Sequence, residues 1–284
     1  MYIKKKLSQL YKNFKNLVYF IRIGEYPVKS IYTSNLNFKS LDVIKKDSTN
    51  LVMSSNNKFL FQKRILDFNK MSDCLTDYSF YFFSHTKRDR YMRKNWNKSE
   101  IFEIYKKSIF QQMKADIFRY CFLFDNGGYW LDIKSNLFFD PKKLTTEESF
   151  NQILISSNPI LDEEIINNNK NLLHITENRK LTNWFIGARQ NSAFLQHLLS
   201  NIIKDYPSHK NIVYTSPKKA ILDFTGPNQL TKSFYEYENK SEISLIDEAK
   251  YDIEHEAKFG RKLNLFDDVF YQHYSKVENS IIVR

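Results

Sequence analysis

The fold of this chain is decided by KADIFRYCFLFDNGGYWLDIK, the stretch from Lys114 to Lys134. Apolar residues recur at intervals of three and four through its first half, which predicts a helix, and Asp125–Gly128 is a helix-stop signal. The pair of glycines permits a tight reversal, after which Tyr129–Ile133 has the composition of a strand. The stretch therefore predicts a helix that returns directly into a sheet.

Strand and helix patterns alternate on both sides of this stretch. The helix is expected to begin after Ser99, a suitable N-cap, and to end at Phe124. Asp77–Phe83 is a nearly continuous apolar and aromatic run that suits a central strand buried on both faces. The other predicted elements are strands at Val28–Thr33, Trp184–Ala188 and Val269–His273, and helices at Asn56–Asn69, at Ser192–Lys204 and after Pro227. This alternation predicts an α/β fold, a single domain over residues 25–284 with a mostly parallel central sheet flanked by helices.

Composition limits the class of protein and the kind of partner. With 284 residues, of which 42% are hydrophobic, the chain can bury one sizeable core. A formal charge of +11 favours anionic partners, which include nucleic acid, lipid head groups, nucleotide diphosphates and acidic glycans. The only cysteines, Cys74 and Cys121, are too far apart in sequence for a metal knuckle and form no disulfide framework. They favour a reducing compartment, and we expect a cytoplasmic protein.

The N-terminal segment, residues 1–24, is predicted to form a basic amphipathic helix. Its first 22 residues contain six Lys or Arg and no acidic residue, with apolar residues at helical spacing. No apolar run of about 18 residues exists in the chain, so we expect no transmembrane helix. The segment either packs on its own domain or attaches the protein peripherally to an anionic membrane surface.

Three charged residues of the Lys114–Lys134 stretch can meet one ligand. Asp116 and Arg119 are three apart on the predicted helix, so they share a face and offer an acceptor and a donor to one polar group. Asp132 ends the following strand, and ligands of open α/β sheets bind beyond the carboxyl ends of strands. Taken singly, such an Asp/Arg pair is usually a solvated ion pair, and a Gly-Gly pair is usually a turn.

Taken together, the residues of this stretch resemble the glycosyltransferases with an Asp-x-Asp sugar-binding region. That group, similar to glycosyltransferase family 32, includes initiating mannosyltransferases, capsule-synthesis enzymes and, more distantly, glucosylating toxins. The shared order is a small residue, Asp116, two apolar residues, Arg119, an apolar stretch, Gly-Gly and Leu-Asp132. The likeness is strong over residues 110–138 and weaker over 26–95 and 180–232, where Asn183–Ala188 and Thr225–Pro227 match.

The resemblance implies a GT-A-like fold and a retaining enzyme that uses a nucleotide sugar, with a UDP-sugar favoured. It would transfer a hexose or N-acetylhexosamine to a glycan or a lipid-linked acceptor. By this likeness Asp116 and Arg119 hold hydroxyls of the donor sugar, Asp132 contacts the sugar or ribose, and Asn183 and Gly226 belong to donor-site segments. We expect both carboxylates to serve a ligand, so that replacing either abolishes transfer with little loss of stability.

One position departs from the family pattern. Lys134 stands where the family commonly has a second Asp that binds Mn²⁺ or Mg²⁺, and an ammonium group cannot ligate a hard cation. Either Lys134 lies near the donor diphosphate and replaces part of the metal charge, or it points away while Asp132 and another group, such as the late His273, hold the ion. We expect divalent-metal use to be retained, because one Lys poorly neutralises a diphosphate.

Two other classes of function remain open from the sequence. A basic nucleic-acid-binding protein would account for the net charge and the 18 tyrosines, although no nucleic-acid-binding motif is present and we expect no specific nucleic-acid partner. A non-catalytic relative that binds a sugar nucleotide without transferring it would account for Lys134. Neither a P-loop, a His-Glu-x-x-His motif nor a Gly-x-Ser-x-Gly motif is found.

Overall fold

A computed structural model describes the greater part of the chain. The described residues are 28–30, 38–41, 44, 49–55, 59–133, 135–144, 152–156, 180–247, 254–255 and 277–284. The basic helix expected at residues 1–24 and the strand expected at Val269–His273 lie outside them, as do Lys134 and His273. The expectations for these residues therefore stay predictions. None of the helices in the described ranges is long and apolar enough to cross a membrane.

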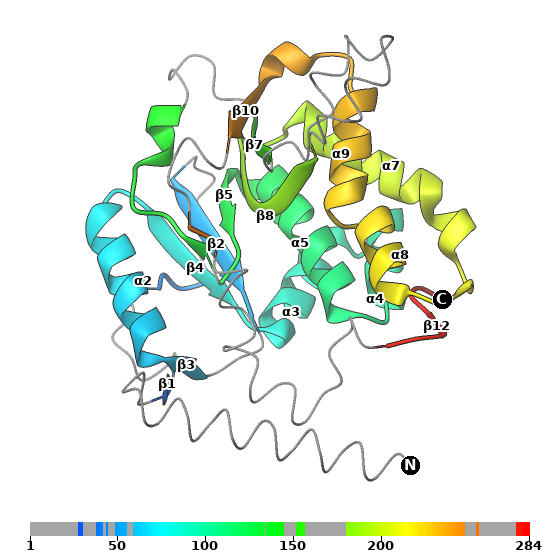
Figure 1. Ribbon diagram of the computed structural model, residues 1–284, viewed down its shortest axis with the longest axis horizontal. Helices are drawn as coiled ribbons and strands as arrows, with labels where there is room; N and C mark the ends of the chain where they lie inside the picture. The colour runs from blue at the N-terminus through cyan, green and yellow to red at the C-terminus, as the bar shows by residue number, and fades with distance from the viewer. Residues whose placement is uncertain are drawn as a thin grey trace, which may run out of the picture.

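A six-stranded sheet forms the centre of the described structure (Figure 1). Its order is β10 (Ile243–Asp247), β7 (Gln152–Ser156), β8 (Leu181–Ala188), β5 (Gly128–Leu131), β2 (Asn50–Ser54) and β4 (Ser79–Phe83). Only β8 runs antiparallel to its neighbours within this sheet, and the other described pairings are parallel. The predicted α/β fold with a mostly parallel sheet flanked by helices is confirmed.

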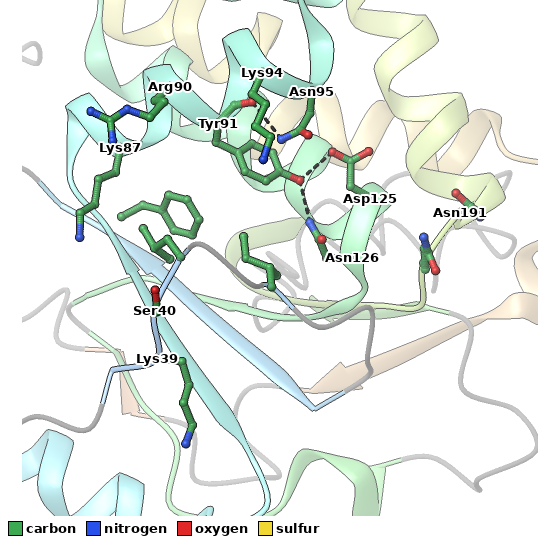
Figure 2. Close-up of a pocket in the computed structure, with 14 residues that line it drawn as sticks. Lys39, Ser40, Lys87, Arg90, Tyr91, Lys94, Asn95, Asp125, Asn126 and Asn191 are labelled. Carbon is green, nitrogen blue, oxygen red and sulfur yellow. Dashed lines mark hydrogen bonds between the residues drawn. The ribbon is translucent and has the colours of Figure 1, made fainter.

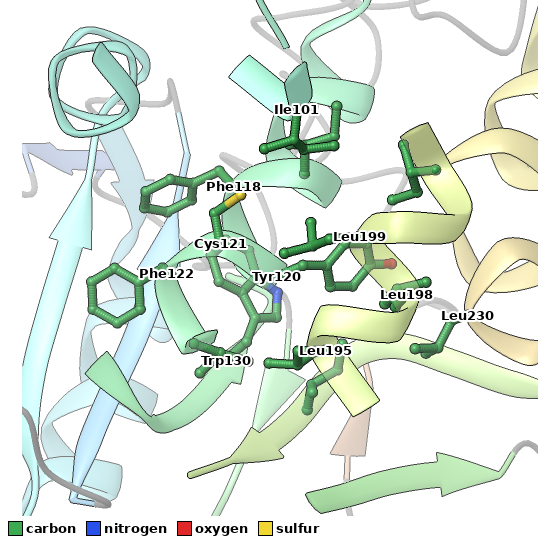
Figure 3. Packing of buried hydrophobic residues seen from close by; sticks show 14 of the residues in the cluster. Ile101, Phe118, Tyr120, Cys121, Phe122, Trp130, Leu195, Leu198, Leu199 and Leu230 are labelled. Atoms are coloured by element: carbon green, nitrogen blue, oxygen red, sulfur yellow. The ribbon is translucent and has the colours of Figure 1, made fainter. Parts of the chain in front are cut away.

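Helices cover both faces of the sheet because successive side chains of its strands point to opposite faces. Val52 and Trp130 contribute to one hydrophobic cluster, whereas their neighbours Leu51, Tyr129 and Leu131 contribute to another. The first cluster packs under α3 (His85–Trp96), α4 (Glu100–Lys107), α5 (Gln111–Asn126), α7 (Ala193–His209), α8 (Pro217–Phe224) and α9 (Pro227–Glu236). The second lies under α2 (Gln62–Cys74). Figure 3 shows Phe118, Cys121 and Phe122 of α5 packed with Trp130 and with leucines of α7.

Shorter strands pair outside the central sheet. They are β1 (Val28–Ser30) with β3 (Phe59–Phe61), β6 (Ser135–Asn136) with β11 (Glu254–His255), and β9 (Val213–Tyr214) with β12 (Ser280–Ile281). A strand lies within the predicted Val28–Thr33 stretch, but β1 is outside the central sheet and pairs antiparallel with β3. Residues 59–61, expected to be helical, are that strand partner, and α2 begins at Gln62.

Two further expectations are corrected by tertiary contacts. The helix expected to run unbroken from Ser99 is two helices, because the backbone of Ser108 and Ile109 pairs with the C-terminal residues Ile282 and Val283. Ser99 does cap the first of them. The strand expected at Asp77–Phe83 is β4, Ser79–Phe83, which is buried along its length as expected but lies at the edge of the described sheet rather than at its centre.

The reversal between α5 and β5 fixes where β5 ends. Gly127 and Gly128 have φ angles of 70° and 98°, which side-chain-bearing residues rarely adopt. A Cβ added to Gly128 would lie 2.3 Å from the carbonyl oxygen of Asn50 on β2. Because the chain turns back within two residues, α5 and β5 lie against each other, and Asp132 follows β5 on the same side of the sheet as the middle of α5.

Candidate active site

Asp116 and Arg119 share one face of α5, as their spacing predicts. Each residue is 6% exposed, and Arg119 Nη2 lies 3.1 Å from Asp116 Oδ1. This pair is therefore a buried ion pair rather than the solvated pair that the spacing alone would suggest. A buried pair requires further hydrogen bonds to offset the desolvation of both charges.

Asp132 joins this pair from the carboxyl end of β5. Its Oδ1 lies 3.4 Å from Arg119 Nη1 and accepts a hydrogen bond of 2.8 Å from Trp130 Nε1. Trp130 precedes Asp132 by two positions, so both side chains leave the strand on the same face, and the Arg119 guanidinium lies 4.7 Å from the Trp130 ring centroid. The Asp132 side chain is 33% exposed, in contrast to its two buried neighbours.

Strand β8 and the segment before α9 complete the hydrogen bonding of Asp116. The side-chain amide of Asn183 donates to Oδ1 at 2.9 Å, and the Thr225 hydroxyl donates to Oδ2 at 3.2 Å. The carbonyl oxygen of Asn183 accepts a hydrogen bond from Arg119. Tyr120 ties the two segments together, since its hydroxyl donates to the Thr225 carbonyl at 3.0 Å. The structure thus brings together Asp116, Arg119, Asp132 and Asn183 from three separate elements.

Gly226, also expected in the donor site, has a packing role in the structure. It is the N-cap of α9, so the predicted helix start after Pro227 is confirmed. A Cβ at this position would lie 2.8 Å from Cα of Leu222 on α8. Glycine therefore lets α8 and α9 approach closely and places the neighbouring Thr225 against Asp116.

Thr225, Tyr120 and Trp130 are site residues that were not predicted from the sequence patterns. Thr225 stands in the sequence only as part of the Thr225–Pro227 segment, and its hydroxyl reaches Asp116 across 109 positions of sequence. Trp130 could have been predicted from the sequence, because its position two residues before Asp132 places both side chains on one face of a strand.

Burial controls the protonation of the two interior charges. It raises the pKa of the Asp116 carboxyl to about 7, with a further contribution from the charge of Asp132, while Arg119 and the bonds from Thr225 and Asn183 oppose the rise. Burial lowers the pKa of Arg119, but the carboxylates of Asp132 and Asp116 outweigh it, and the net pKa is raised. Arg119 therefore stays charged between the two carboxyl groups.

Asp132 has a carboxylate oxygen that can bind a ligand. Among the described residues, Oδ2 of Asp132 accepts no hydrogen bond, whereas both oxygens of Asp116 are used. No group of three or more His, Cys, Asp or Glu side chains that could hold a metal lies within the described ranges. Asp132 can still offer one carboxylate oxygen to a divalent cation whose other ligands are phosphate and water oxygens.

Comparisons with known proteins give one family match and a similarity to a solved structure. Residues 98–216 match the family described as "Capsular polysaccharide synthesis protein". The match covers less than half of the chain, and it includes Asp116, Arg119, Asp132 and Asn183 but ends before Thr225. A search of the curated proteins found no match. Among solved structures, the chain is similar to "PaToxG Glycosyltransferase", with 14% identity and a TM-score of 0.44 over 81% of this chain and 80% of that one.

Proposed function

We propose that this protein is a glycosyltransferase that binds a nucleotide sugar beyond the carboxyl end of β5. The observation that carries the proposal is the Asp132 carboxylate, which Arg119 and Trp130 hold through Oδ1 and whose side chain is one-third exposed. Ligands of open α/β sheets bind at this edge, and ionised carboxylates accept hydrogen bonds from sugar hydroxyls. The family match over residues 98–216 supports a role in polysaccharide synthesis.

The different burial of Asp116, Arg119 and Asp132 suggests a separate role for each residue. Asp132 is the residue most accessible to a ligand, so we assign to it the contact with the donor sugar or ribose. Arg119 orients Asp132 and offers its guanidinium to a sugar hydroxyl. Asp116 orients Arg119 in turn and has room for one more hydrogen bond, because a carboxylate accepts about four and the three described donors are Arg119, Asn183 and Thr225.

The finer chemistry rests on the resemblance of the Lys114–Lys134 stretch to the Asp-x-Asp glycosyltransferases. From it we propose a UDP-sugar donor, transfer of a hexose or N-acetylhexosamine with retention of configuration, and a glycan or lipid-linked acceptor. A GT-A-like fold and a cytoplasmic location, with residues 1–24 at a membrane surface, belong to the same proposal.

A test of the proposal is donor binding measured by thermal unfolding. The full-length protein is heated with a panel of UDP- and GDP-sugars, because a ligand that binds only the folded state raises the unfolding midpoint by mass action. We expect one nucleotide sugar to raise the midpoint of wild type by several degrees and to leave the midpoint of Asp132→Asn unchanged. No shift with any donor in the panel, or equal shifts in both proteins, would contradict the proposal.

Metal dependence is a separate prediction. We propose that Mn²⁺ or Mg²⁺ neutralises the diphosphate, with Asp132 as its protein carboxylate and His273 as a second candidate ligand. Lys134, at the position of the family's second Asp, supplies at most one positive charge. Donor turnover should therefore fall to background in excess EDTA, both for wild type and for Lys134→Asp. Full turnover of wild type in EDTA would show that Lys134 and its neighbours replace the metal.

A further inference from the structure

A cavity lies beside α3, next to the edge strand β4 and the end of α5. Its volume is about 910 Å³, and Figure 2 shows the residues that line it. They come from residues 39–41 and 44, from the end of β4, from α3, from the end of α5 and from the turn after β8 (Lys39, Ser40, Leu41, Ile44, Phe83, Lys87, Arg90, Tyr91, Lys94, Asn95, Asp125, Asn126, Gln190 and Asn191). We call it the α3 groove.

The α3 groove is separate from the proposed donor site. Asp125, in its lining, is nine positions after Asp116 on α5, which corresponds to roughly 13 Å along a helix. Asn126, in the lining, precedes β5, whereas Asp132 follows that strand. The groove also reaches Phe83 at the end of the parallel strand β4, so it extends along α3 rather than lying at one end of the sheet. No lining residue of the groove belongs to the Asp116, Arg119 and Asp132 cluster.

Positive charge dominates the groove. Lys87, Arg90 and Lys94 follow one face of α3 at intervals of three and four, and Lys39 joins them from the segment whose backbone bonds the edge of β4. All four side chains are exposed, and within the described ranges none of them forms an ion pair. The one carboxylate in the lining, Asp125, accepts hydrogen bonds from the Tyr91 hydroxyl and from Trp96 Nε1, both at 2.7 Å.

Side-chain amides supply the remaining polar surface. Asn95, Gln190 and Asn191 line the groove, and within the described part of the chain the Gln190 and Asn191 amides make no hydrogen bond. Amides donate to and accept from hydroxyl groups, which suits a sugar chain. The aromatic rings are not available for stacking. Tyr91 packs edge-on against Phe83 and its hydroxyl is held by Asp125, while Phe83 is 1% exposed.

From these features we propose that the α3 groove binds an acidic polysaccharide chain, with its carboxylate or phosphate groups on Lys87, Arg90 and Lys94 and its hydroxyls on the amides. The choice of a glycan rests on the proposed function. Single-stranded nucleic acid is disfavoured, because its binding sites stack bases on exposed aromatic rings and the described lining has none to offer. The groove would hold an acceptor or product chain along α3, on residues that do not belong to the donor cluster.

The test compares two triple variants of matched charge. Lys87→Gln/Arg90→Gln/Lys94→Gln removes the α3 cations, and Lys204→Gln/Lys218→Gln/Lys219→Gln removes three exposed lysines of α7 and α8, outside the groove lining. Binding to a polygalacturonate oligosaccharide is measured by calorimetry at low salt, with an uncharged galactan of equal length and an oligo-dT of equal charge as further probes. Thermal unfolding checks that each variant is folded.

We expect the α3 variant to bind polygalacturonate about tenfold more weakly than wild type, and the α7/α8 variant to bind it as wild type does. Equal weakening in both variants would show that the loss of net positive charge alone explains the weaker binding, and it would overturn the proposal. So would unchanged binding by the α3 variant, or tighter binding of oligo-dT than of polygalacturonate. Donor binding by the α3 variant should match wild type, and Asp132→Asn should keep its oligosaccharide affinity, so failure at one site is distinguishable from failure at the other.

Discussion

Replacing Asp132 with asparagine should lower sugar transfer by about 100-fold or more, while the free energy of unfolding changes little. The substitution keeps the shape of the side chain and an oxygen that can accept the bond from Trp130 Nε1. It removes the negative charge beside Arg119 and replaces one oxygen of the carboxylate that we assign to the donor. Because this side chain is one-third exposed, its loss of charge should disturb packing only slightly.

The measurements for Asp132→Asn are initial rates of transfer from the donor found by thermal unfolding, together with the unfolding midpoint. Asp77→Asn is the matched control, since it removes the same charge from an exposed turn outside the site. The control should transfer at the wild-type rate. Activity of Asp132→Asn within a few-fold of wild type would remove Asp132 from the donor site.

Replacing Asp116 with alanine should abolish transfer and also destabilise the fold by about 3 kcal/mol. The sequence alone led to the expectation of little stability loss. Burial and hydrogen bonding change that expectation, because alanine would remove the buried carboxylate that Arg119, Asn183 and Thr225 all contact. The free energy of unfolding in denaturant measures the effect. Glu103→Ala is the control, since it breaks an ion pair of the same spacing at the surface and should leave that free energy nearly unchanged. A loss from Asp116→Ala no larger than that of the control would contradict the structure.

Asp116→Asn tests the raised pKa of Asp116 through the pH dependence of the free energy of unfolding. The carboxyl has a pKa of about 7 in the folded protein, raised from 3.8. The folded state therefore binds the proton more tightly, and the stability that Asp116 contributes is present at low pH and is lost as the pH rises through 7. Asparagine cannot ionise. We expect wild type to lose stability relative to Asp116→Asn between pH 5 and pH 8, and a constant difference across that range would contradict the raised pKa.

The local elements of the site were predictable from the sequence. Helical spacing in the Lys114–Lys134 stretch, the Gly127-Gly128 stop signal and the apolar run after it give the end of α5, the reversal and β5 within a few residues of their observed bounds. The spacing of Asp116 and Arg119 likewise fixes their common face. These features depend on interactions between residues close in sequence, whose geometry is nearly independent of the rest of the chain.

Sheet order and strand pairing were harder to predict from the sequence. Strands β2, β7 and β10 were not anticipated, and Val28–Ser30 pairs with β3 outside the sheet. The break in the expected long helix at Ser108 arises from pairing with Val283, a residue 175 positions away. A short apolar run does not show which strand it will pair with, because β-pairing and its register depend on contacts between residues far apart in sequence.

The sequence by itself determined that this protein is α/β, that Asp116 and Arg119 act as a pair, and that Asp132 ends the neighbouring strand. Only the tertiary structure decided which of the three reaches solvent. Asn183 from β8 and Thr225 from the start of α9 close over Asp116 and bury it with Arg119, while Asp132 stays partly exposed. The physical reason is that burial depends on which distant segments pack over a side chain, and that information does not reside in the residues next to it.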